Sequence, residues 1–164
     1  MSKPAVRIPK ESYTFWVPGR PVAWARARTS GGRYFTAPEQ ADDQAAIRAA
    51  YSSDRARPGM NSTKAWGLLV GVFLTPPASW TKLRRLNALS GWVRPTGTPD
   101  WDNFGKQVSD ALAGLCWAND SQIVDGGVTK HYSATACRCI TIWEVGTVLQ
   151  GRSREAVALH EERW

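Results

Sequence analysis

Cysteine and histidine are scarce in this chain. Its 164 residues include three Cys and only two His, His131 and His160. An odd number of cysteines argues against a secreted scaffold held by disulfides. A zinc site would need more sulfur and nitrogen ligands at regular spacing, so zinc is not expected. We therefore expect buried, reduced cysteines in a cytoplasmic protein.

Long apolar runs are also missing. No N-terminal segment has the apolar stretch of a signal peptide, and none approaches the roughly 20 apolar residues of a membrane span. The sequence shows no internal repeat and no low-complexity segment. A hydrophobic content of 43% is ordinary for a globular protein. We expect one domain over residues 1–164, with a flexible tail at 1–10, a C-terminal extension at 147–164 and no membrane partner.

Acidic residues are concentrated in one short segment of an otherwise basic chain. The net charge of +7 suggests a polyanionic partner, with nucleic acid as the first candidate. Residues 100–125 oppose this trend, because they hold five Asp, no Glu and one Lys. Close carboxylates repel each other and are usually kept where a cation relieves the repulsion. The alternative is a solvated acidic loop at the surface.

Hydrophobic periodicity predicts an α+β domain with a mixed β-sheet. We expect the strands near residues 13–24, 66–75, 123–133 and 137–145, and the packed helices near residues 38–52 and 103–115. The first strand is interrupted at Pro18-Gly19, and residues 31–40 are expected to form a turn that leads into a helix. Residues 78–91 favour a further helical piece, and the final residues suggest a short terminal helix.

The acidic segment places its charges at informative spacings. Asp100 and Asp102 are two residues apart, so in an extended segment both carboxylates point to the same side. Lys106 and Asp110 follow Asp102 at intervals of four and share one helix face with it. The opposite stripe is apolar and should pack into the core: Phe104, Val108, Ala111 and Leu115. Asp120 lies past the helix end, in a turn that can return it to the aspartate pair.

Three carboxylates without His or Cys form a hard oxygen donor set, which suits Mg²⁺ or Mn²⁺. Beside a basic surface, such a metal suggests phosphodiester chemistry, and Lys106 would stabilise the charge that develops on the phosphate. The alternatives are structural: Asp102 as a helix N-cap, and Asp102, Lys106 and Asp110 as a ladder of salt bridges. A calcium loop is a poor match, because the twelve-residue spacing is missing.

The pattern PDWDNFGKQVSDAL, followed by NDSQIV and KHY, resembles the RusA family of Holliday-junction resolvases. The likeness extends over about residues 13–145 and includes an Arg-rich segment after the first strand and a Pro-Trp-basic stretch. The resemblance implies a RusA-like fold and a homodimeric, Mg²⁺-dependent endonuclease that cuts four-way DNA junctions by paired symmetric nicks. It implies no small-molecule cofactor and a cytoplasmic location in a bacterial or phage-infected cell.

The resemblance also implies roles for individual residues. Asp100, Asp102 and Asp120 would be the catalytic, metal-binding carboxylates, and Lys106 the catalytic lysine. Asn119 stands where the family usually has an aspartate, so metal affinity or preference is expected to differ. Asp125 is a weaker candidate, which we interpret as ordinary surface.

Basic and aromatic residues flank the acidic segment. We expect the following to contact phosphates, with solvated surface charge as the alternative for each: Arg26, Arg28, Lys82, Arg84, Arg85 and Lys130. Trp80, Trp92 and Trp101 are candidates for stacking at a branch point, although burial in the core is the default expectation for each. Two other functions stay open: a less selective metal-dependent nuclease, and a module that binds junctions without cutting.

Overall fold

The computed structural model describes residues 8–26, 28–30, 33–35 and 37–146, so the expected C-terminal helix lies outside the described residues. Its centre is a four-stranded sheet in the order β1-β6-β4-β5. The strands are Ser12–Pro18 (β1), Ala65–Leu74 (β4), Ile123–Tyr132 (β5) and Cys137–Val145 (β6). β4 and β5 are parallel and the other neighbours are antiparallel, which confirms the mixed sheet of an α+β fold.

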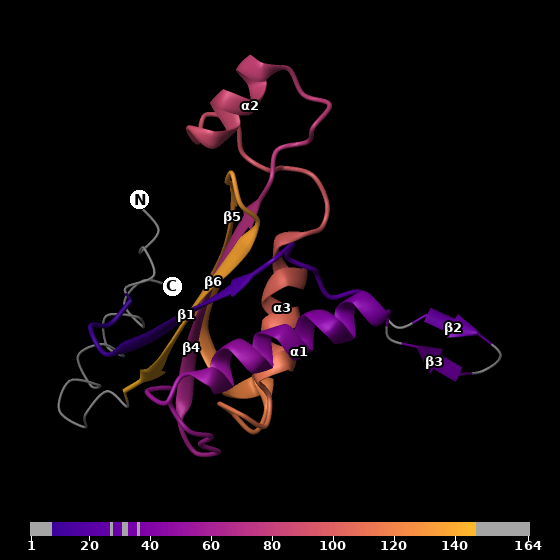
Figure 1. Ribbon diagram of the computed structural model, residues 1–164. Coiled ribbons are helices and arrows are strands. Elements are labelled where there is room, and N and C mark those ends of the chain that lie inside the picture. Colours follow the sequence, from indigo (N-terminus) through magenta and orange to yellow (C-terminus); the bar gives the residue numbers. More distant parts are fainter. Residues whose placement is uncertain (1–7, 27, 31–32, 36, 147–164) are drawn as a thin grey trace, which may run out of the picture.

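Two helices, α1 (Pro38–Ser53) and α3 (Trp101–Leu112), pack against one face of the sheet, and a third, α2 (Lys82–Leu89), projects beyond its end (Figure 1). A 3₁₀ turn, η1 (Asp120–Gln122), leads into β5. A small antiparallel hairpin of β2 (Arg28–Ser30) and β3 (Arg33–Phe35) stands apart from the sheet. No helix among the described residues is long and apolar enough to cross a membrane.

Two expectations about the N-terminal part were wrong. The first strand ends at Pro18 and does not resume, because Gly19 has a φ of +99° and turns the chain out of the sheet. The β2–β3 hairpin was expected to be only a turn. Its strands have three residues each, too few for an alternating pattern to be visible in the sequence.

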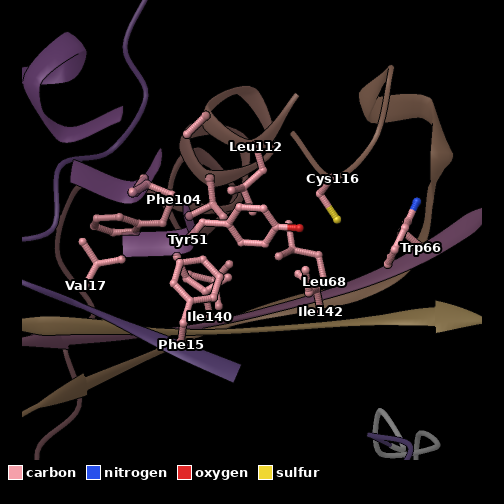
Figure 2. Close-up of a cluster of buried hydrophobic side chains, with 14 of the residues drawn as sticks. Phe15, Val17, Tyr51, Trp66, Leu68, Phe104, Leu112, Cys116, Ile140 and Ile142 are labelled. Carbon is pink, nitrogen blue, oxygen red and sulfur yellow. The ribbon is translucent and has the colours of Figure 1, made fainter. Parts of the chain in front are cut away.

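The core lies between the sheet and the two packed helices (Figure 2). Phe15 of β1 packs edge-on against Tyr51 of α1, with ring centroids 5.6 Å apart. From α3, Phe104 and Val108 are fully buried, which confirms the predicted apolar stripe. Leu115 lies beyond the end of α3 and packs against the core only in part. Burial of this stripe leaves the opposite face of α3 free for charged residues.

A buried polar network fixes α3 relative to α1 and β6. Arg138 of β6 is only 2% exposed, and its guanidinium forms a two-pronged pair with Asp43 of α1, with Arg138 Nη1 2.7 Å from Asp43 Oδ2. Gln107 of α3 donates from Nε2 to the same Asp43 oxygen at 3.0 Å and to the carbonyl of Gln40 at 2.9 Å. One carboxylate therefore joins three elements, and the polar face of α3 points away from them.

Candidate active site

The helix that carries the acidic segment begins earlier than the sequence suggested. α3 starts at Trp101, with Asp100 as its N-cap residue, although the Asp100 side chain makes no capping hydrogen bond. Asp102 therefore lies in the first turn of the helix, so the expectations that it is the N-cap and that it shares an extended segment with Asp100 were wrong. Negative charge at a helix N-terminus is stabilised by the helix dipole. Both carboxylates are exposed at this end of α3.

Asp102 lies where two hollows meet. The larger hollow, of about 970 Å³, runs between residues 24–26, α3 and β5, and its walls include Arg26, Asp102 and Lys106. The smaller one, of about 470 Å³, includes Asp100, Asp102 and Lys130. Asp102 and Trp101 line both. The surface at the start of α3 is thus concave on two sides and carries charges of both signs.

Gly126 gives the larger hollow a wall of bare backbone. This residue of β5 lines the hollow beside Asp125. A Cβ at position 126 would overlap the carbonyl oxygen of Leu68 on the neighbouring strand. Only glycine is compatible with that close approach of the two strands.

Lys106 connects α3 to the turn before β5. Its Nζ donates to Asp110 Oδ1 at 2.8 Å and to Asp120 Oδ2 at 3.3 Å. These two carboxylates raise the pKa of Lys106, and the hydrogen bond to Asp110 is the largest cause. The ammonium is thus held in its charged form. We expected Asp120 to return to the aspartate pair; it does return to the charged face of α3, but its neighbour there is Lys106.

Asn119 has a structural role that the sequence did not reveal. Its Oδ1 accepts from Ser121 N at 2.9 Å and caps η1, while Gln122 Oε1 accepts from Asn119 N at 3.2 Å. The Gln122 amide also donates to the carbonyls of Asn61 and Lys64, at 2.9 and 2.8 Å. Asp120, the first residue of η1, is therefore presented by a capped and anchored turn. An amide performs this capping without adding a charge beside Asp120.

The three expected metal-binding carboxylates do not lie together. Asp100 and Asp102 line one hollow and offer the oxygen ligands that Mg²⁺ prefers. Asp120 lines neither hollow and is engaged by Lys106. Within the described parts of the chain, no three His, Cys, Asp or Glu side chains lie close enough together to hold a metal ion. The predicted three-carboxylate centre is therefore represented by two carboxylates on one side of α3 and a third paired with the lysine.

Arg26 is held near this site by the backbone that precedes it. Trp24 N donates to the carbonyl of Asn103 at 3.0 Å, and Ala25 N donates to Gln40 Oε1 at 3.2 Å. These bonds attach the segment to the first turns of α3 and α1. Arg26 consequently lines the same hollow as Asp102 and Lys106. Arg28 belongs to β2, and its side chain lies outside the described part of the structure.

The other basic residues fall into two groups. Lys82, Arg84 and Arg85 lie exposed on α2, away from the two hollows. Lys130 on β5 donates from Nζ to the carbonyls of Gly97 and Pro99, at 2.7 and 2.9 Å. It therefore holds the loop that enters the acidic segment, a role that the sequence did not indicate. Phosphate contacts by all four stay predictions.

Asp125 lies at the candidate active site, contrary to expectation. It lines the larger hollow together with Arg26, Asp102 and Lys106, although we interpreted it as ordinary surface. The signal was its neighbour Gly126, since a glycine inside a strand marks a close backbone approach or a ligand site.

The three candidate tryptophans are less buried than the default expectation of core residues. Trp92 and Trp101 are exposed, and Trp80 is only partly buried.

Comparison with known proteins identifies the family of this chain. The sequence pattern of a nuclease family described as "Endodeoxyribonuclease RusA" matches residues 18–142, which include β4, β5, α3 and the walls of both hollows. The chain belongs to the RusA endodeoxyribonuclease family. It is also 35% identical over 123 residues to a protein of Bacillus subtilis (strain 168) named "Uncharacterized protein YqaN". That similarity covers 73% of this chain and 87% of the relative.

Proposed function

We propose that this protein is a structure-selective, Mg²⁺-dependent endodeoxyribonuclease that resolves four-way DNA junctions by paired symmetric nicks. Membership of the RusA endodeoxyribonuclease family supports the reaction class. The observation that supports the site most directly is the hollow in which Arg26, Asp102 and Lys106 come together. An arginine and a lysine beside a carboxylate suit a phosphodiester that must be bound and then attacked.

In this proposal Asp100 and Asp102 would hold the metal, and Asp120 would be available as a third ligand if its contact with Lys106 opened. When bound, Mg²⁺ or Mn²⁺ would polarise the phosphate and lower the pKa of a bound water. Lys106, released from Asp120 and still held by Asp110, places a positive charge where the phosphate becomes more negative. Arg26 orients the same phosphate by a charge-assisted hydrogen bond.

The proposed substrate and assembly follow from charge and symmetry. A four-way junction is a polyanion with near two-fold symmetry, so a homodimer presents one site to each of two opposed strands. The net charge of +7 favours such a partner and predicts binding that weakens steeply with salt. We place this activity in the cytoplasm of a bacterial or phage-infected cell.

A nicking assay tests the proposal. A synthetic four-way junction and a linear duplex of the same sequence are incubated with the wild type and with Asp102→Asn, in Mg²⁺ or in EDTA. We expect symmetric nicks in the junction alone, only with Mg²⁺, and a loss of at least about a hundredfold in the variant, because a ligand charge is removed.

The other outcomes identify the alternatives. Equal cutting of duplex and junction would keep the site but assign a less selective nuclease. Tight junction binding without cutting in Mg²⁺ or Mn²⁺ would overturn the enzymatic proposal and favour a binding module. Asp42→Asn, on the exposed surface of α1, serves as the control for the loss of one carboxylate charge, made away from both hollows.

A further inference from the structure

The segment between β4 and the acidic loop carries unusual exposed apolar side chains. We call residues 80–94 the α2 arm; Figure 1 shows its helix projecting beyond the end of the sheet. Leu83 is 69% exposed, Leu86 51% and Trp92 84%. Clustered apolar side chains at the surface usually mark a contact with another molecule.

Both ends of the α2 arm are attached to β5 by consecutive residues. At its start, the Trp80 ring packs edge-on against Tyr132, with centroids 5.4 Å apart. At its end, Arg94 Nη1 lies 3.0 Å from His131 Nδ1. Burial and the nearby Arg94 lower the pKa of His131, so the imidazole is neutral and accepts this hydrogen bond. The α2 arm therefore projects from the sheet with both of its ends held against β5.

The charge of the α2 arm favours a nucleic-acid partner. The arm carries four basic residues, namely Lys82, Arg84, Arg85 and Arg94, and the sequence holds no Asp or Glu between residues 55 and 99. Two copies of this arm facing each other across a two-fold axis would bring like charges together. A polyanion meets no such repulsion, and its bases offer flat apolar faces to tryptophan.

The α2 arm is continuous with the candidate active site. The chain that leaves Arg94 passes directly into the loop whose residues Thr96 and Gly97 share the smaller hollow with Asp100 and Asp102. Lys130, the residue next to His131, holds this loop through the carbonyls of Gly97 and Pro99. The α2 arm therefore leads along the chain directly into the loop beside the carboxylates.

We propose that the α2 arm is a second DNA-contact surface, on which Trp92 stacks against bases exposed at the branch point of a junction. This inference rests on the proposed DNA substrate, but it concerns recognition and is separate from cutting. The leucines of α2 cover the adjacent sugar and base surface, and the basic side chains contact the flanking phosphates. A continuous duplex exposes no base faces, so the arm favours branched DNA.

The test measures binding without metal, so that it does not depend on catalysis. A four-way junction with 2-aminopurine at its branch point and a linear duplex of the same sequence are titrated in EDTA. The proteins are the wild type, Trp92→Ala, Trp92→Phe and Trp16→Ala, a matched change of an exposed tryptophan on β1.

We expect Trp92→Ala to weaken junction binding about tenfold, the effect of losing one stacked base, and duplex binding less than about twofold. Trp92→Phe should recover most of the junction affinity, and Trp16→Ala should behave as wild type. The change in 2-aminopurine fluorescence on binding should disappear only in Trp92→Ala.

Two results would overturn the inference. One is an equal loss, or no loss, of affinity for junction and duplex in Trp92→Ala. The other is a dimer that dissociates in Trp92→Ala but not in Trp16→Ala by sedimentation, which would make the arm an interface between copies. A wild type that shows the Trp92-dependent preference yet cuts no DNA with Mg²⁺ or Mn²⁺ would keep this inference and reject the proposed enzymatic function.

Discussion

Lys106 Nζ lies 2.8 Å from Asp110 Oδ1 and 3.3 Å from Asp120 Oδ2, so one ammonium pairs with two carboxylates. The lysine side chain is 44% exposed, and rearrangement of its contacts is therefore not opposed by packing. Asp110 is an i+4 partner on the same helix, whereas Asp120 comes from η1. The two contacts differ in kind: Asp110 holds Lys106 within α3, whereas Asp120 joins it to a separate turn.

This difference predicts a positioning role for Asp110. Asp110→Asn should lower the kcat for junction nicking about tenfold, the effect of one charge-assisted hydrogen bond, with little change in KM. The reason is that Lys106 loses its fixed partner while the DNA-contact residues are unchanged. Single-turnover nicking rates and junction affinity in EDTA provide the two measurements.

Asp110→Glu, which keeps the charge on the same helix face, is the control and should recover most of the rate. Equal rates for Asp110→Asn and wild type would contradict the role. A matching loss in the Tm of Asp110→Asn would assign Asp110 to stability instead.

For single residues, the sequence predicted positions on the helix face better than it predicted interaction partners. The spacing of Asp102, Lys106 and Asp110 was sufficient to place them on one face, because helix geometry alone determines it. The partner of Asp120 was not predictable, since a carboxylate is neutralised by whichever cation is nearest in the folded chain. The exposure of Trp92 was also missed, because composition favours burial for any single tryptophan.

At the scale of elements, β5 organises the site through one short run of residues. Lys130 holds the loop before α3. The next residue, His131, contacts the end of the α2 arm, and Tyr132 contacts its start. Strand β5 itself was predicted from its apolar pattern. The attachments of β5 to the loop and to the α2 arm were not predicted, because they involve backbone carbonyls and side chains that are far away in the sequence.

Two roles for Lys130 make opposite predictions. As a positioning residue, Lys130→Met should lower the nicking rate about tenfold, because the loop that carries Asp100 loses two hydrogen bonds, while junction affinity in EDTA changes less than about twofold. As a phosphate contact, it should weaken binding to all DNA and reduce the salt slope by about one. The structure leads us to expect the first result.

Lys64→Met is the matched control, since among the described residues the Lys64 side chain forms a surface pair with Glu144 and no other ion pair. A normal nicking rate together with normal DNA binding in Lys130→Met would exclude both roles. A loss of binding with an unchanged rate at saturating DNA would favour the phosphate contact.

At the scale of the whole molecule, stability depends on the buried charges that join the layers. Arg138→Met should destabilise the protein by about 3–5 kcal/mol, because the Asp43 carboxylate stays buried without its partner. Urea unfolding monitored by circular dichroism measures the change.

The double variant Asp43→Asn/Arg138→Met separates charge from packing. Removal of both charges should restore a large part of the lost stability. If the single and double variants lose equal stability, the packing of the arginine side chain stabilises the protein and the Asp43–Arg138 ion pair does not.

The parallel pairing of β4 and β5 has a consequence for how such proteins diversify. Because these strands are adjacent and run in the same direction, the chain must return across the molecule between them, and residues 75–122 make that single return. The α2 arm, the acidic helix and η1 all belong to this one excursion. Both ends of the arm contact neighbouring positions on β5, so their separation is set by the sheet and not by the length of the arm. The arm is thus an insertion whose sequence can be replaced between two fixed ends. Its length and chemistry can vary without disturbing the carboxylates, which would let one hydrolytic centre serve different branched substrates.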